Sequence, residues 1–236
     1  MERFALAAAV TPQIVPIGRN AEPVIVIDGV MADWTQMRGF AATQDYRDVG
    51  KNGGFPGLRA PLPAEYVRVL LRKIDPIIRA TFFAERAVKL GSFDCNLSLV
   101  TYAPAALHPA QKLPHVDFAA ENRVAVLHYL CADHFGGTAF YRHLSLDAEQ
   151  IGPELRESWL AARQEEKAAL PPDAGYPDEN TPGYHRIAAF DARPDRLLIY
   201  RSHTLHSGII DRPELLNFDP QTGRLTANFF LDYVRA

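Results

Sequence analysis

The stretch Leu113-Pro114-His115-Val116-Asp117-Phe118 constrains the architecture of this 236-residue chain more than any other. In an extended strand, residues i and i+2 point to the same side, so the side chains of His115 and Asp117 can converge on one point. A third candidate ligand, His206, lies 89 residues beyond Asp117 and must arrive from another strand. These three residues therefore predict a barrel or sandwich of strands that closes around a common site.

Two imidazoles and one carboxylate are the donor set that binds one face of an octahedral Fe(II) ion and leaves the opposite face open for co-substrate and dioxygen. A His-x-Asp pair is short and common, so this interpretation depends on the rest of the sequence. His203 is an alternative to His206, because it lies only three residues earlier. If His203 is not a ligand, we expect it to support the site by a hydrogen bond or to be exposed.

The composition limits the classes of function. Apolar residues make up 47% of the chain and charged residues 22%, which is typical of a globular protein. A formal net charge of −3 and the lack of a basic stripe argue against nucleic-acid binding. The first 15 residues have neither a basic segment nor a long apolar one, so we expect no signal peptide and no membrane span. The only cysteines, Cys95 and Cys131, lie in apolar runs, which favours a cytoplasmic protein without disulfides.

The pattern of apolar residues predicts a mainly β structure with supporting helices. The N-terminal part predicts a strand at 23–28, a short helix at 32–43, a Gly- and Pro-rich loop at 46–63 and a helix at 63–82 that Pro76 kinks or ends. From residue 94 the chain changes to short apolar runs that predict strands at 95–102, 123–131, 137–142, 185–190, 196–201 and 224–234. We therefore expect a single domain over residues 1–236, with helical support in 1–93 and a β core in 94–236.

One insert interrupts this core at about residues 147–183. It contains a predicted helix at 147–170, followed by a Pro- and Gly-rich loop at 171–183. Such an insert is typical of a lid or a segment that contacts substrate, because variable loops on rigid scaffolds carry specificity. A helix that only covers an exposed sheet remains an equal alternative.

Four motifs in this part of the chain resemble those of the 2-oxoglutarate/Fe(II)-dependent dioxygenases, and more narrowly their prolyl-hydroxylase-like branch. They are Pro114-His-Val-Asp117, His128-Tyr-Leu130 followed by Gly136-Gly-Thr138, Leu198-Ile-Tyr-Arg-Ser-His-Thr-Leu-His206-Ser-Gly208, and Gly223-Arg224-Leu-Thr-Ala-Asn-Phe-Phe-Leu231. The resemblance covers about residues 95–234. It implies a double-stranded β-helix (a jelly-roll barrel) and a hydroxylase that uses Fe(II), 2-oxoglutarate and dioxygen.

The same resemblance implies roles for particular residues. His115, Asp117 and His206 would be the iron ligands, Tyr102 and Tyr129 would form hydrogen bonds with 2-oxoglutarate, and Arg224 would bind its far carboxylate. An arginine suits that role because its planar guanidinium matches a carboxylate with two hydrogen bonds.

The strand that begins at Arg224 independently supports a polar cavity. Arg224, Thr226 and Asn228 alternate with Leu225, Ala227 and Phe229, so one face is polar and the other apolar. Arg224 lies 18 residues after His206, farther than the resemblance leads us to expect. Arg212, six residues after His206, is therefore a competitor for the carboxylate, although its place in a loop before a proline favours Arg224.

The remaining histidines and the tryptophans carry no signal for a site. His128 is expected to be a packed or hydrogen-bonded core residue, because it lies in a strand on the opposite face from Tyr129. We expect the other histidines to be surface or loop residues and the tryptophans to be packing residues: His108, His134, His143, His185, Trp34 and Trp159.

Two other classes of function compete with a dioxygenase. One is a non-redox metal-binding barrel of the cupin type, which commonly uses more histidines and a glutamate and has no need of Arg224. The other is a catalytically inactive binding module, which the loss of a ligand would have favoured. The primary substrate stays open, with prolyl peptides, free amino acids and small natural products all possible, and so does the oligomeric state.

Overall fold

The computed structural model describes residues 4–236, so the first three residues of the predicted N-terminal support lie outside it. Two antiparallel sheets form its centre: one has eight strands in the order β1-β2-β9-β6-β11-β5-β4-β3, and the other has three in the order β10-β7-β8. The strands are β1 (Gln13–Ile17), β2 (Glu22–Asp28), β3 (Arg47–Asp48), β4 (Gly57–Pro61), β5 (Val88–Val100), β6 (Arg123–Tyr129), β7 (Gly137–His143), β8 (Tyr184–Asp191), β9 (Arg196–Arg201), β10 (His206–Ile209) and β11 (Arg224–Arg235).

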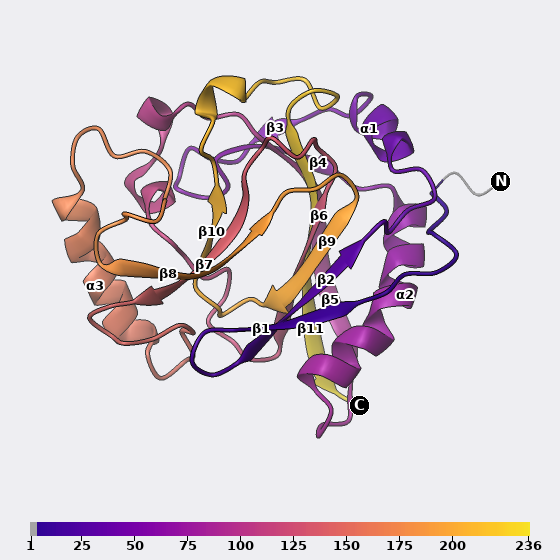
Figure 1. Ribbon diagram of the computed structural model, residues 1–236, viewed down its shortest axis with the longest axis horizontal. Coiled ribbons are helices and arrows are strands. Elements are labelled where there is room, and N and C mark those ends of the chain that lie inside the picture. The colour runs from indigo at the N-terminus through magenta and orange to yellow at the C-terminus, as the bar shows by residue number, and fades with distance from the viewer. Residues whose placement is uncertain (1–3) are drawn as a thin grey trace.

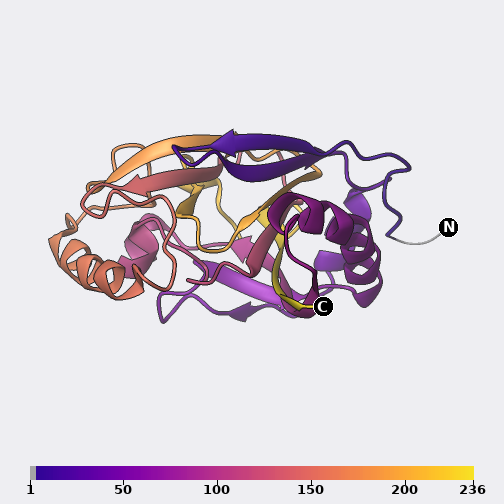
Figure 2. The ribbon, with the colours of Figure 1, turned by 90° about the horizontal axis from the view of Figure 1, so that it is seen from below.

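Three α-helices flank the sheets: α1 (Thr35–Ala41), α2 (Ala64–Phe82) and α3 (Arg156–Ala169). Three short 3-10 segments accompany them: η1 (Pro104–Ala106), η2 (Pro109–Lys112) and η3 (Pro213–Leu215). Figure 1 places α1 and α2 at one end of the molecule, and α3 at the other; Figure 2 shows the same separation from below. None of the helices among residues 4–236 is long and apolar enough to cross a membrane.

The large sheet buries both of its faces. Its outer face packs against the apolar side of α2, where Leu70, Ile74 and Ile78 are almost completely buried. Its inner face packs against the small sheet, and Phe140 of β7 lies among residues of β6 and β9 there. The alternation predicted for residues 224–229 is confirmed, because Leu225, Ala227 and Phe229 join the α2 core while the polar residues between them face the other way.

Several predicted elements differ from those in the structure. The predicted loop at 46–63 contains β3 and β4, so the N-terminal part supplies strands β1 to β4 to the large sheet as well as helical support. The predicted helix at 63–82 is observed as α2, and Pro76 does not end it: an interior proline costs about 3 kcal/mol, which the large buried apolar face of α2 offsets. The insert helix begins at Arg156 rather than 147, since Ala148 and Gln150 form isolated β-bridges with His143 and Thr204.

Two predictions about histidines can be compared with the structure. His128 is completely buried, and its ring nitrogens contact the Tyr66 hydroxyl at 2.6 Å and an Asp195 carboxylate oxygen at 2.9 Å, which confirms the core role. The prediction that His143 is a surface residue is wrong. It is 1% exposed, because α3 and its following loop cover the end of β7, and its Nε2 lies 2.8 Å from a carboxylate oxygen of Glu166.

We predict that Tyr66→Phe destabilises the protein by about 1–3 kcal/mol, because it leaves His128 Nδ1 buried without a partner. Urea unfolding of the variant should show a lower midpoint with an unchanged slope. Tyr46→Phe is the matched control: the Tyr46 hydroxyl is buried and has no hydrogen-bond partner among the described residues, so its removal should be neutral or stabilising. Equal losses in the two variants would contradict this account.

Candidate metal centre

Two backbone hydrogen bonds hold the candidate ligands His115 and His206 next to each other. The N–H of each residue donates to the carbonyl of the other at 2.8 Å, which forms an antiparallel bridge between segments far apart in the sequence. The N–H of Asp117 donates to the Ser202 carbonyl at 2.9 Å, so the pairing continues past the bridge. His115 lies in this isolated bridge and Asp117 at a bend two residues later, and the ligand atoms of both side chains reach the same point.

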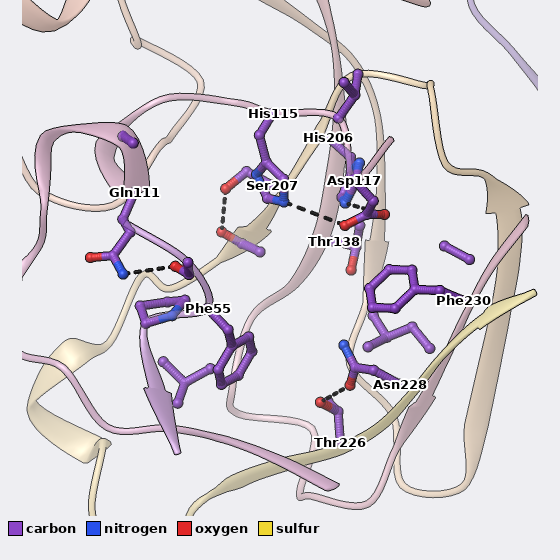
Figure 3. Close-up of a pocket in the computed structure, with 18 of the residues that line it drawn as sticks. Phe55, Gln111, His115, Asp117, Thr138, His206, Ser207, Thr226, Asn228 and Phe230 are labelled. Carbon is purple, nitrogen blue, oxygen red and sulfur yellow. Dashed lines mark hydrogen bonds and ion pairs between the residues drawn. The ribbon is translucent and has the colours of Figure 1, made fainter. Parts of the chain in front are cut away.

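The structure brings the three predicted ligands together. The ligand atoms of His115, Asp117 and His206 all lie within 4.8 Å of one another, and no other such group of three occurs among residues 4–236. Asp117 lies 3.8 Å from His115 Nε2 through one carboxylate oxygen and 3.5 Å from His206 Nε2 through the other. Neighbouring ligands at about 2.1 Å from an octahedral ion are about 3 Å apart, so a small contraction would suffice. Figure 3 shows the three side chains pointing toward one another.

The hydrogen bonds of His206 and Asp117 leave one potential ligand atom of each side chain available to a cation. His206 Nδ1 donates to the Thr204 carbonyl at 2.9 Å, which leaves Nε2, the ring nitrogen that faces Asp117, as the one that could bind a metal. One carboxylate oxygen of Asp117, Oδ2, is buried without any hydrogen-bond partner in the described structure. A buried carboxylate oxygen without a partner is costly, and a metal ion is one of the groups that can satisfy it.

The surroundings shift the protonation of two ligands. Desolvation within the cavity, reinforced by the charges of His206 and Arg163, holds the pKa of the half-buried His115 well below its usual range, so the ring is neutral and can donate a lone pair. Burial raises the pKa of Asp117, although His206, Arg59 and Arg123 oppose this shift. A divalent cation would favour the ionised carboxylate and remove the cost of its burial.

These residues line a cavity of about 600 Å³ between the two sheets. The polar face of β11 supplies Arg224, Thr226 and Asn228 to it, and Figure 3 shows the last two across the cavity from the ligand group. The guanidinium of Arg224 donates to the carbonyls of Phe135 at 3.0 Å and Gly137 at 2.8 Å through Nε and Nη2. Its Nη1 has no hydrogen-bond partner in the described structure.

The other predicted residues lie in different places. Tyr129 is completely buried behind the cavity wall, where its hydroxyl pairs with Thr138 at 2.6 Å, and Arg224 lies 5.9 Å from the centre of its ring. The Tyr102 hydroxyl donates to Asp48 at 2.6 Å, and Tyr102 is not part of the cavity lining. Arg212 is exposed and lies 3.5 Å from Glu214. His203 is buried in the wall of a different cavity, beside Glu149.

The insert contributes residues that the sequence did not single out. Trp159 and Arg163 of α3 both line the cavity, so α3 does more than cover the sheet. Arg163 donates to the carbonyls of Pro114 and Ala110, and thereby fixes the backbone just before His115. Arg59 of β4 also lines the cavity. Its alternation with Leu58 and Ala60 in a predicted loop was too short a signal to identify it.

Solved structures with the same arrangement of strands identify the fold. HygX from Streptomyces hygroscopicus, solved with nickel, 2-oxoglutarate and hygromycin B bound, is 15% identical with a TM-score of 0.51, over 92% of this chain and 84% of that one. SnoN, a non-heme alpha ketoglutarate dependent epimerase from nogalamycin biosynthesis, is 15% identical with a TM-score of 0.50, over 91% and 77% of the chains. The chain shares the fold of these two proteins.

A Pseudomonas putida prolyl-4-hydroxylase also matches, with 14% identity and a TM-score of 0.43 over 86% of this chain and 88% of that one. No curated protein matches the sequence. Residues 8–231 match the model of the family of unknown function DUF6445, and the chain belongs to that family.

Proposed function

We propose that this protein is an Fe(II)- and 2-oxoglutarate-dependent dioxygenase with a double-stranded β-helix core. The observation that carries the proposal is the group formed by His115, Asp117 and His206 on the wall of a cavity that also contains Arg224. Two imidazoles and one carboxylate are the donor set of such iron sites, and all three come from one side and leave the cavity side open. When bound, the metal would supply the activation of dioxygen.

The chain's own residues would bind and orient the reactants. His115, Asp117 and His206 would hold the metal, with the Thr204 carbonyl fixing the orientation of His206. Arg224 would receive the far carboxylate of 2-oxoglutarate on its free Nη1, while the two carbonyls that it already contacts hold the guanidinium in place. Thr138, which the Tyr129 hydroxyl orients, lines the same part of the cavity and could add a hydrogen bond.

A non-redox metal-binding barrel is the second candidate. It would use the same three ligands, but it gives no reason for a buried arginine with a free donor in the cavity. The prolyl-hydroxylase-like branch remains a prediction, and the cytoplasmic location and the single-domain organisation also remain predictions. Hydroxylation is the reaction type that we propose for the primary substrate.

We predict that Asp117→Ala abolishes metal binding while the fold is retained, because the variant loses the carboxylate that completes the ligand set but leaves the apolar cores intact. Titration with Co(II), followed by its visible absorption, should show at least about a hundredfold weaker binding than in the wild type. His203→Gln is the control for the competing histidine and should bind Co(II) normally. Full binding by Asp117→Ala would place the metal elsewhere.

We predict that Arg224→Gln weakens 2-oxoglutarate binding by about two to three orders of magnitude, because it leaves the far carboxylate buried and unpaired. The measurement is the visible charge-transfer band that forms when Fe(II) and 2-oxoglutarate are added without oxygen. Co(II) binding should change little, and Arg212→Gln should behave as wild type. A normal band in Arg224→Gln with a loss in Arg212→Gln would reverse the assignment; no band in the wild type would refute the use of 2-oxoglutarate.

A further inference from the structure

The cavity extends beyond the ligand group and Arg224 to a wall formed by β4 and the loop before it. Phe55 and Pro56 of that loop line this wall, together with Arg59. Gln111 holds the loop in place, because its amide nitrogen donates to the Gly50 carbonyl at 3.0 Å and the Gly54 carbonyl at 2.8 Å. Figure 3 shows Phe55 and Gln111 on this side. The proposed metal and co-substrate sites leave this part of the cavity free.

Four arginines line the cavity, and they differ in how the protein uses their charge. Three are engaged: Arg123 lies 3.3 Å from Asp232, Arg163 donates to the carbonyls of Ala110 and Pro114, and Arg224 donates to those of Phe135 and Gly137. The side chain of Arg59 has no hydrogen bond and no ion pair to any of residues 4–236. It is therefore the one cavity arginine in the described structure with its full donor capacity unused.

The backbone register explains why Arg59 faces the cavity. It pairs with Ser98 of β5, which in turn pairs with Thr226 of β11, so the three lie in one row across the large sheet. Thr226 belongs to the polar face of β11 that lines the cavity. The guanidinium of Arg59 lies 5.3 Å from the centre of the Phe55 ring, which supports the group from one side, while its Nε is buried without a partner.

The buried guanidinium of Arg59 is energetically unfavourable without a counterion. Burial lowers the pKa of Arg59, and the carboxylates of Asp94 and Asp117 offset this only from beyond ion-pair distance. The negative charge of Asp117 would in addition be balanced by the metal, so Asp117 could not act as the counterion of Arg59. Fe(II), Asp117 and 2-oxoglutarate together carry one net negative charge, which Arg224 balances, so loading the site does not supply a counterion for Arg59. The cavity therefore keeps a positive charge that an anion can neutralise.

We propose that Arg59 binds a carboxylate of the primary substrate, and that Phe55 and Trp159 contact the apolar part of the same molecule. This inference rests on the proposed function, and it narrows the substrate class to small carboxylic acids that carry an apolar group. A guanidinium can hold a carboxylate with two hydrogen bonds, so it would orient the substrate as well as attract it. Asp94 also lines the cavity, but it is exposed, accepts a hydrogen bond from the Asn96 amide at 3.3 Å and forms no ion pair with Arg59.

The test uses the protein loaded with Zn(II) and 2-oxoglutarate, and two probes of nearly equal shape, phenylacetate and neutral phenylacetamide. Saturation-transfer NMR titrations should show that the wild type binds the acid at least about tenfold more tightly than the amide, as expected for hydrogen bonds to a charged group. Arg59→Met retains the apolar stem of the side chain and should bind both probes equally weakly. Arg212→Met, which removes an exposed charge outside the cavity, should keep the preference.

A second measurement separates this inference from the proposed function. The anaerobic charge-transfer band with Fe(II) and 2-oxoglutarate should be the same in wild type and in Arg59→Met. If Arg59→Met melts at a much lower temperature than wild type, Arg59→Gln is used in its place. Equal binding of the two probes by wild type, or an unchanged preference in Arg59→Met, refutes the inference alone. A lost band in Arg59→Met also refutes it, because Arg59 would then bind the co-substrate. An absent band in wild type refutes the proposed function itself.

Discussion

The reciprocal backbone hydrogen bonds between His115 and His206 are the contact on which the candidate site depends. They join a segment that belongs to no long strand to the beginning of β10. Both residues thereby acquire fixed backbones before any metal is present. Because main-chain atoms form this bridge, the pairing of the two residues does not depend on their side chains. Asp117 follows from the same pairing, since its N–H bonds to the carbonyl of Ser202 on the opposite segment.

The insert and the N-terminal part both reinforce this arrangement from outside the core. Arg163 of α3 contacts the backbone immediately before His115, and Trp159 extends the same helix face into the cavity. The strands β3 and β4 widen the large sheet and bring Arg59 into line with Thr226. A segment on each side of the cavity thus adds residues to its wall.

The cavity shows how one residue type can serve different purposes in the same space. Arg163 positions backbone, Arg123 balances Asp232, and Arg224 is held by carbonyls with one donor left free. Arg59 is unengaged. The energetic difference is large, because a buried guanidinium loses its hydration and regains that energy only through a partner. The number of partners, rather than the presence of an arginine, therefore distinguishes supporting residues from candidate ligand-binding residues.

The sequence by itself predicted that His115, Asp117 and His206 lie together, and it predicted most of the core strands from local patterns. The two-residue spacing of His115 and Asp117 and the alternation after Arg224 both follow from the geometry of an extended chain. The burial of His128 also agreed with its place in an apolar strand. The features that depend on contacts between segments far apart in the sequence were decided by the tertiary structure. The short strands β1, β4 and β10 exist through pairing, His143 is buried because α3 covers it, and Arg59 faces the cavity only because β5 sets its register.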